Sequence, residues 1–354
     1  MKILLVSPQN RTIRGAISDY CKRGLEFLGN EVYCFDLENH PYAENKVIAF
    51  FKKKVRKIFP SLPSPYEISA AVRSLSDKET NKRLIAFARL CKPDLVLVFL
   101  GENISAGTID EIKRETGTVC VNWIFDTLLL PYRREIFYKV RSAYDYIFLV
   151  DSTEILSDLG GDASRIMSLP LGCDIFVHKK MLLSENEMKN YGSDVAFVGT
   201  VTPEREKFLE KLTCFDLKIW GRFENCSPGL KHCLQKKDIY AGEAVKVYNA
   251  SKIIIDHHIL YGRKKNIFNV TPRVFEVPAS GGFLLTPDIP HLREFYKAGE
   301  EIIVYHTVEE LVELVRYYLS RPEEIKKISE KAYQRAHKEH TYQRRLKYLL
   351  EAVS

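Results

Sequence analysis

The chain has 354 residues, of which 45% are hydrophobic and 28% are charged. At roughly 150 residues per domain this length predicts about two domains. The composition is that of an ordinary globular protein, which argues against long disordered tails, collagen-like repeats and coiled-coil arrays. Lys and Arg total 53 against 46 Asp and Glu, a net charge of +7. This excess weakly favours anionic partners without choosing between phosphates, nucleic acid and a membrane surface.

The N-terminal residues and the cysteines bear on the compartment. The apolar run at Ile3–Val6 ends before Pro8 and is too short for the core of a signal peptide. No stretch approaches the ~18 apolar residues that a bilayer span requires. The eight cysteines are scattered, without a C-x-x-C pair, so we expect buried, reduced thiols and no disulfide framework. These observations predict a cytoplasmic protein.

The first half of the chain predicts a parallel α/β sheet. A short strand at Lys2–Val6 precedes helical spacing of apolar residues that stops at Gly29, and a second strand follows at Glu31–Phe35. Strand, helix and strand within so few residues form a βαβ unit. Further strands are predicted at Leu95–Leu100, Val119–Ile124 and Tyr146–Val150, with a helix at Thr108–Glu115. Strands that are apolar throughout suit a sheet covered on both faces.

A second α/β series begins after a turn-rich, polar region at residues 168–192. Its strands are predicted at Val195–Val198, Leu217–Trp220, Lys252–Ile255, Phe283–Leu285 and Ile302–Val304, and the last 45 residues favour two or three consecutive helices. We therefore predict two tandem Rossmann-type domains, at residues 1–172 and 173–338, and a terminal helix at 339–354 that packs back on the first domain.

The stretch from Asp194 to Arg205 has the features of an anion site. A strand runs into Gly199, and Thr202-Pro203 then opens a helix, since Thr is a preferred cap and Pro suits the first helical position. The N–H groups at such a helix start bind anions at the carboxyl end of a parallel strand. Arg205 lies in the first turn, where the helix dipole disfavours a cation unless a phosphate is bound. The alternative is that it pairs with a neighbouring glutamate or faces solvent.

A second candidate site begins at Thr271-Pro272, which we interpret as another helix start. Arg273 and Glu276 are three residues apart and share one face of a short helix. They could bind a phosphate and ribose hydroxyl groups respectively. The alternative is a surface ion pair of little energetic value.

Three further positions follow predicted strands. Asp126 could orient a substrate hydroxyl group or act as a catalytic base, although an aspartate at the end of a strand more often caps a helix or forms a turn. Gly15 could border a cleft, and His258, in Asp256-His-His258, could line a substrate-binding site. No third ligand has a recognisable spacing, so we predict no metal site.

Taken together, three segments resemble the CgeB-type spore-protein glycosyltransferases, relatives of the group 1 glycosyltransferases of GT-B fold. They are FVGT with the following PER, Tyr248–Ile253, and the run from Pro272 to Thr286; Phe295-x-x-x-Gly299-x-Glu301, Tyr305–Leu311 and the region after His340 agree. The resemblance covers residues 194–348 well. The N-terminal half matches only in the order of its strands and helices.

This resemblance implies a GT-B-like α/β fold, in which two Rossmann-type doubly wound parallel-sheet domains face a cleft, with C-terminal helices. It also implies that a nucleotide-diphosphate sugar is the substrate and that no cofactor is needed. Carried over by position, Gly199, Thr200 and Arg205 would contact the donor diphosphate, with Arg273 nearby, and Glu276 would bind the ribose. The sequence departs from the broader group at Phe268, where the E-x7-E pattern has a glutamate.

A basic amphipathic segment lies at residues 46–59, where six Lys and Arg side chains interleave with apolar residues. Such a helix could contact an anionic membrane or hold a charged acceptor. The alternative is a helix packed on the sheet with a solvated basic face. No recognition motif accompanies the charge, so we predict no nucleic-acid partner.

We therefore predict a metal-independent glycosyltransferase, whose acceptor is an unidentified glycan, lipid-linked molecule or protein. It could act in cell-envelope, polysaccharide or spore-coat glycan synthesis, with peripheral contact at the inner membrane face. A non-catalytic assembly or coat protein of the same fold is one alternative, which Phe268 favours. A nucleotide-sugar epimerase is another, since it shares the architecture and needs no acceptor.

Overall fold

The computed structural model of the chain describes residues 1–9, 12–37, 65–152, 163–223, 226–235, 238–257 and 270–354. In the helix Pro65–Cys91 the side chains are described from Ser76 onward. The predicted basic segment at 46–59, His258 and Phe268 lie outside the described residues.

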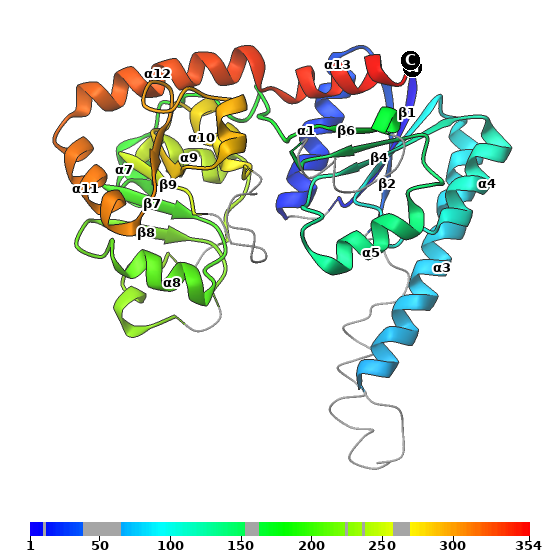
Figure 1. Cartoon of the computed structure of the whole chain (residues 1–354), viewed down its shortest axis with the longest axis horizontal. Coiled ribbons are helices and arrows are strands. Elements are labelled where there is room, and N and C mark those ends of the chain that lie inside the picture. Colours follow the sequence, from blue (N-terminus) through cyan, green and yellow to red (C-terminus); the bar gives the residue numbers. More distant parts are fainter. Residues whose placement is uncertain (10–11, 38–64, 153–162, 224–225, 236–237, 258–269) are drawn as a thin grey trace. The chain divides into compact units, whose positions relative to one another are not determined.

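The first sheet has the strand order β2-β1-β3-β4-β5-β6 (Figure 1). Its strands are β1 (Lys2–Ser7), β2 (Glu31–Asp36), β3 (Leu95–Phe99), β4 (Val119–Ile124), β5 (Tyr146–Leu149) and β6 (Ile166–Ser168). The pairs from β2 to β5 are parallel. The helices of this part of the chain are α1 (Ile13–Phe27), α3 (Pro65–Cys91), α4 (Ala106–Thr116) and α5 (Pro131–Val140), with a 3-10 turn at Ala163–Arg165.

The second sheet has the order β11-β10-β9-β7-β8, and its paired strands are parallel. These strands are β7 (Val195–Val198), β8 (Leu217–Trp220), β9 (Ile253–Ile255), β10 (Leu284–Pro287) and β11 (Ile303–Tyr305). The helices are α7 (Glu185–Tyr191), α8 (Pro203–Glu210), α9 (Gly242–Ala250), α10 (Arg273–Ala279), α11 (Val308–Leu319), α12 (Pro322–Glu339) and α13 (Tyr342–Ala352). Two 3-10 turns lie at Pro228–Leu230 and Pro290–Glu294.

Both sheets share one strand order. Counted from its own first strand, each contains the order 2-1-3-4-5, which is that of doubly wound folds. The predicted fold class of two doubly wound parallel sheets is confirmed. In each sheet the order reverses next to the first strand, between β1 and β3 and between β7 and β9.

Apolar runs form the centres of both sheets, as their sequences predict. All five residues of β3 are fully buried, as are Ile3–Val6 of β1. On one face of the second sheet, Phe208 of α8 and Leu311 of α11 join a single buried cluster with the strand residues. Burial on both faces explains why these strands lack the alternation of half-exposed strands.

The chain is divided into two compact units. The first comprises Met1–Asn10, Leu25–Leu149 and Asp162–Met167; the second comprises Arg11–Gly24, Val150–Gly161 and Ser168–Ser354. The first fourteen residues of the second unit belong largely to α1, which lies early in the sequence. Within this unit the ring of Tyr20 in α1 lies 5.7 Å from the ring of Tyr342 in α13.

The elements agree with the sequence prediction in most places. The ten predicted strands correspond to β1–β5 and β7–β11, with shifts of one or two residues at their ends. The strand β6 and the helices α5 and α7 are among the elements that were not predicted. The last residues form three helices, as expected.

The cysteines follow the prediction less closely. All eight are free thiols, and five of them are buried, but Cys34 and Cys226 are half-buried and Cys214 is exposed. The expectation of buried thiols is therefore wrong for Cys214, because it lies in the polar turn after α8 and not in a strand.

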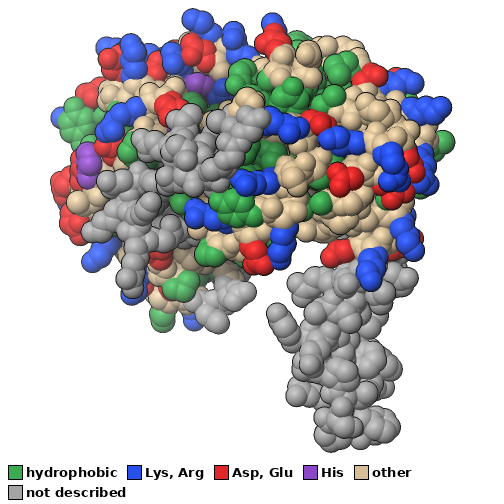
Figure 2. Space-filling model, turned by 45° about the vertical axis from the view of Figure 1, so that its right-hand side comes forward, with side chains coloured by type: hydrophobic (Ala, Val, Ile, Leu, Met, Phe, Trp, Pro, Cys, Tyr) green, Lys and Arg blue, Asp and Glu red, His purple; other side chains and the backbone are tan. Residues whose placement is uncertain are grey.

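Charge is mixed on the surface that Figure 2 shows. Basic and acidic side chains are interspersed among the described residues of that face, so the basic excess does not form a single patch there. None of the described helices combines the length and the apolar character needed to cross a membrane.

Candidate functional site

The switch point of the second sheet lies between the neighbouring strands β7 and β9. Gly199 follows β7, and Asp256 and His257 follow β9. In open α/β sheets, ligands bind outside the carboxyl ends of the strands at such a point. The predicted diphosphate residues therefore surround the position that the topology favours for a ligand.

Two glycines allow the strand ends to approach each other closely here. Gly199 has a φ of +156°, and a Cβ atom at this position would lie 3.0 Å from Nη1 of Arg273. Gly221, which follows β8, has a φ of +131°, and its Cβ would lie 2.4 Å from the carbonyl oxygen of Gly199. Only Gly199 was predicted to be important. The pattern of a strand ending in Trp220-Gly221 could have identified the second glycine.

Helix α8 begins as predicted. Oγ1 of Thr202 accepts a hydrogen bond from the backbone N–H of Arg205 at 3.3 Å, and Pro203 occupies the first helical position. The backbone N–H groups of this turn lie next to the Gly199 loop. They form the positive end of the helix dipole, where an anion is stabilised.

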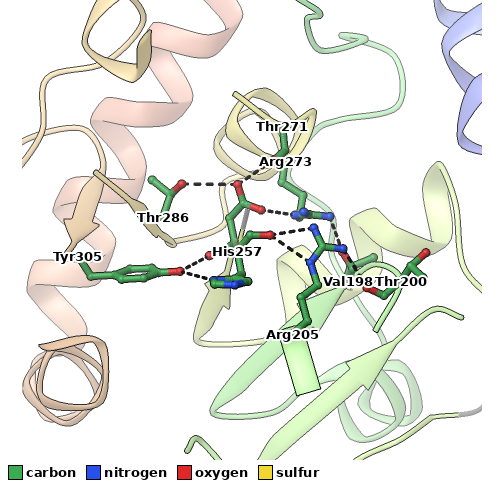
Figure 3. A network of polar contacts seen from close by, with 9 residues as sticks. Val198, Thr200, Arg205, His257, Thr271, Arg273, Thr286 and Tyr305 are labelled. Atoms are coloured by element: carbon green, nitrogen blue, oxygen red, sulfur yellow. Dashed lines mark hydrogen bonds and ion pairs between the residues drawn. The ribbon is translucent and has the colours of Figure 1, made fainter. Parts of the chain in front are cut away.

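Arg205 connects the two loops of the switch point. Its side chain is buried, and Nη1 donates to the carbonyl oxygen of Thr200 while Nη2 donates to that of His257, both at 2.8 Å (Figure 3). A guanidinium group has five N–H donors in a fixed plane. It can therefore hold both loops and donate to an anion.

Arg273 forms a buried ion pair with Asp256, whose side chain is fully buried. Nε of Arg273 donates to Oδ1 of Asp256, and Nη1 donates to the carbonyl oxygen of Val198, both at 2.7 Å (Figure 3). The hydroxyl group of Thr271 donates to Oδ2 of Asp256 at 2.7 Å, and that of Thr286 lies at 3.5 Å.

The structure corrects two predictions about this segment. Thr271 does not cap α10: Pro272 precedes the helix in a helical conformation without a side-chain cap, and the Thr271 hydroxyl bonds Asp256 instead. The alternative of a surface ion pair between Arg273 and Glu276 is also wrong. Glu276 is only 5% exposed, and the carboxylate that pairs with Arg273 is Asp256. Asp256 was not singled out as a polar anchor, although its position directly after a strand is the relevant signal.

Phe197 supports both arginines. Its ring is fully buried in β7, and the guanidinium carbons of Arg205 and Arg273 each lie 5.5 Å from the ring centre. Such cation–π contacts favour a guanidinium group over an aromatic face. Two positive groups are thus held against one side chain of the strand that leads into Gly199.

Glu276 lies one helical turn from Arg273 in a poorly solvated position. Burial raises the pKa of its carboxyl group from 4.5 to about 7, although Arg273 and a hydrogen bond from Tyr248 act in the opposite direction. Among the described residues, Oε1 of Glu276 has no hydrogen-bond partner. A buried carboxyl group with an unmet acceptor is costly, and such groups are concentrated at functional sites.

Sequence reasoning missed the residues around Glu276. Tyr248 of α9, His178 of the loop before α7, and Tyr20 of α1 all lie near it: Tyr248 donates to the carboxyl group, His178 approaches it, and the pKa of the Tyr20 hydroxyl is raised by burial and by Glu276. These residues are separated by up to 256 positions from Glu276. No local pattern could connect them.

The other predicted site residues lie elsewhere. Asp126, which follows β4, forms an ion pair at 2.6 Å with Arg133, and Arg133 also pairs with Glu102. Gly15 lies in the first turn of α1, where its N–H donates to Oγ1 of Thr12 at 3.4 Å. Neither residue belongs to the second sheet.

A surface groove of about 520 Å³ adjoins the start of α8. Its lining includes Pro203, Lys207, Phe208, His257 and Val308. The ring of His257 stacks on Phe208 with 4.1 Å between the ring centres, while its carbonyl oxygen binds Arg205. The groove therefore shares a residue with the switch point. In the described part of the chain, no group of three or more His, Cys, Asp or Glu side chains could hold a metal ion.

Comparison with known proteins gives this geometry a family context. A family model described as glycosyl transferase-like matches residues 205–351, which include Arg205, Arg273 and Glu276. Spore protein CgeB of Bacillus subtilis strain 168 is 22% identical over 304 residues, covering 79% of this chain and 87% of that protein. The resemblance to CgeB is confirmed.

Solved structures extend the CgeB-like match to the fold of the whole chain. The HepE protein of Anabaena, crystallised with UDP-glucose, superposes with a TM-score of 0.64 at 11% identity and covers 100% of this chain and 99% of its own. Sucrose-phosphate synthase of Thermosynechococcus elongatus superposes with a TM-score of 0.65 at 12% identity and 100% coverage of both chains. Identity this low shows the fold alone. The predicted GT-B-like fold is confirmed.

Proposed function

We propose that this protein is a glycosyltransferase that moves a sugar from a nucleotide-diphosphate donor to a hydroxyl-bearing acceptor. The observation that carries the proposal is the gathering of Gly199, the first turn of α8, Arg205 and Arg273 at the switch point of the second sheet. The glycosyl transferase-like family match and the UDP-glucose bound by the HepE protein support the same donor class.

The site's contribution to the reaction would be electrostatic. As the sugar leaves, negative charge develops on the diphosphate, and fixed donors aimed at that charge stabilise the transition state. Arg205, Arg273 and the N–H groups of α8 would supply such donors, with Thr200 beside them. A cationic clamp of this kind can replace a divalent metal, so we propose a metal-independent enzyme without a cofactor.

Further roles in the reaction are assigned from the sequence. Glu276 would bind the ribose, and Asp126 would orient the acceptor or act as its base. The acceptor would be a glycan, a lipid-linked molecule or a protein in envelope, polysaccharide or spore-coat glycan synthesis. The basic segment at 46–59 would provide peripheral membrane contact.

Calorimetry on two variants tests the donor site. Arg205→Ala should weaken UDP binding by at least 10-fold while leaving uridine binding nearly unchanged, because a charge-assisted hydrogen bond contributes roughly 1.5–3 kcal/mol. Glu276→Ala should weaken UDP and uridine alike, since a ribose is common to both. ADP and GDP with their nucleosides serve in the same way if another base is preferred, and titration with EDTA or Mg²⁺ tests the metal independence.

Arg316→Ala is the matched control, because Arg316 is an exposed arginine of α11 that pairs with Glu313. It should leave all affinities unchanged. Thermal unfolding shows whether Arg205→Ala still folds, and Arg205→Lys provides a milder variant. Wild-type affinity in folded Arg205 and Glu276 variants would show that the site is elsewhere. Nucleotide binding without transfer of labelled sugar to any acceptor would favour the non-catalytic alternative, and conversion of the donor without acceptor would favour an epimerase.

A further inference from the structure

The side chain of His178 faces Oε1 of Glu276, which has no hydrogen-bond partner among the described residues. Nε2 of His178 lies 3.9 Å from Oε1 of Glu276, and both side chains are at least nine-tenths buried. The two residues come from the loop after Asp174 and from α10, within one unit of the chain.

Hydrogen bonding determines which nitrogen of His178 carries the proton. The backbone N–H of Asp174 donates to Nδ1 of His178 at 2.9 Å, so Nδ1 must be an acceptor. Burial, with Arg23 and His337 nearby, lowers the pKa of His178 to about 3, and the ring is neutral at ordinary pH. The single ring proton is therefore on Nε2, and the N–H group is directed toward Glu276.

The separation of these two atoms is informative. At 3.9 Å it exceeds the 2.7–3.2 Å range of direct N–H···O hydrogen bonds. A hydroxyl oxygen about 2.8 Å from each atom would form a triangle with an apex angle of about 90°. Such a hydroxyl group would accept from Nε2 and donate to Oε1, and it would thereby satisfy an acceptor that the described part of the chain leaves without a partner.

We infer that His178 is a second binding residue of the donor site, and that its Nε2–H and the Oε1 of Glu276 together hold one hydroxyl group of the ligand. This inference rests on the proposed function, which makes that group a ribose hydroxyl. Neutral His178 donates a hydrogen bond to this hydroxyl group, and Glu276 accepts one from it. The pair therefore distinguishes a hydroxyl group from both a hydrogen atom and a methyl ether.

The surrounding contacts keep His178 in this orientation. The carboxylate of Asp174 accepts two hydrogen bonds from Arg23 of α1 at 2.7 and 2.9 Å, and a third from the N–H of Phe176 at 2.7 Å. The ring of Tyr20 packs edge-on against His178 with 5.0 Å between ring centres. The imidazole is thus fixed by the backbone on one side and by an aromatic ring on another, as a preorganised donor requires.

The test compares UDP with 2′-deoxy-UDP and 3′-deoxy-UDP by calorimetry, for the wild type and for His178→Phe and His178→Asn. The wild type should bind one deoxy compound about 5- to 10-fold more weakly than UDP, the effect of one neutral hydrogen bond. His178→Phe keeps a ring against Tyr20 and should bind UDP more weakly than the wild type does. Both variants should discriminate less between UDP and that deoxy compound, because Glu276 alone then binds the hydroxyl group.

His291→Phe is the matched control, because His291 is also buried with a lowered pKa but packs against Phe295. It should keep the wild-type preference. If the wild type binds no nucleotide, the proposed function itself fails. If the wild type binds UDP but folded His178 variants discriminate as it does, a buried water molecule occupies the gap and this inference is overturned while the proposed function stands.

Discussion

Asp256 and Glu276 are two buried carboxyl groups on either side of Arg273, and their surroundings differ. Asp256 accepts from the guanidinium group of Arg273 and from a threonine hydroxyl. Glu276 receives a hydrogen bond from Tyr248, and its other oxygen has no partner among the described residues. The first arrangement stabilises a charge and holds a loop, whereas the second leaves binding capacity for a ligand.

The raised pKa of Glu276 makes the stability of the protein depend on pH. Because the folded state binds this proton more tightly than the unfolded state, the free energy of unfolding should fall as pH rises from about 4.5 through about 7. The loss is on the order of 1–3 kcal/mol, since one pKa unit corresponds to about 1.4 kcal/mol. Glu276→Gln should remove this dependence and be more stable than the wild type at pH 8. Denaturant unfolding at a series of pH values measures both slopes.

Glu313→Gln is the control for this measurement, because Glu313 is an exposed residue of α11 whose side chain is 70% exposed. It should change the free energy of unfolding by less than about 0.5 kcal/mol at any pH. Equal pH slopes in the wild type and Glu276→Gln would contradict the assignment of a buried carboxyl group with a raised pKa at this position.

Individual site residues were predictable where a local pattern identified them. Gly199 and Arg205 follow a strand and begin a helix, and the structure brings both to the switch point of the second sheet. The acceptors of Arg205 are backbone carbonyl oxygens, one of them 52 residues away, and Asp256 binds Arg273 from a separate strand. Such partners depend on which strands are neighbours, and spacing along the chain does not contain that information.

At the scale of elements, the start of α8 brings the proposed anion site and the helix cap together. Thr202 caps the helix through the N–H of Arg205, and the same turn carries the side chain that holds Thr200 and His257. Thr202→Ala should lower the free energy of unfolding by about 1 kcal/mol, the usual cost of removing such a cap. It should also weaken UDP binding, since the first turn of α8 then loses its anchor.

Thr202→Ser is the matched comparison, because serine keeps the hydroxyl group and caps helices as well as threonine does. Denaturant unfolding and UDP calorimetry on the two variants separate the cap from the loss of a methyl group. A serine variant as unstable as the alanine variant would argue that packing of the methyl group, and not the hydrogen bond, is what matters.

Element types were predicted well because the relevant signals are local. Thr202-Pro203 predicted a helix start, and continuous apolar runs predicted buried strands. The same signal failed at Thr271-Pro272, where the threonine hydroxyl bonds a buried aspartate in place of the helix end. A threonine hydroxyl group can cap a helix, but it can also bind another side chain. At Thr271 the charged carboxylate of Asp256 binds the hydroxyl group in place of the helix end.

At the scale of the whole molecule, the doubly wound topology was predictable from the sequence. The division of the chain into two units was not. Alternation of strands and helices predicts parallel sheets, and the crossover rule restricts their arrangement. That Arg11–Gly24 groups with the second unit depends on contacts such as Arg23 with Asp174, which are 151 residues apart. Glu276 and His178, the two residues proposed to bind the ribose, lie near Tyr20 within this unit.

The backbone contact between Cys173 and Thr341 joins two segments that are distant in sequence. The N–H of Cys173 donates to the carbonyl oxygen of His340 at 2.8 Å, and the N–H of Tyr342 donates to that of Cys173 at 2.9 Å. Gly172 makes this approach possible, because a Cβ atom there would lie 2.8 Å from the carbonyl oxygen of His340 and 3.2 Å from the backbone nitrogen of Tyr342. Backbone atoms on both sides cannot rotate away as a side chain could.

Gly172→Ala should therefore destabilise the protein by about 1–3 kcal/mol through overpacking. It should also weaken UDP binding, because the displaced segment continues into Asp174 and His178.

Gly107→Ala is the matched control. Gly107 is an exposed residue of α4 with no atom within 4 Å of the added Cβ, and alanine there should be neutral or stabilise by about 0.4–1 kcal/mol. Denaturant unfolding and UDP calorimetry on both variants measure these effects. Equal stability of the two variants would mean that the segments around Cys173 and Thr341 separate easily. Unchanged UDP affinity in Gly172→Ala would show that this backbone contact does not affect the proposed donor site.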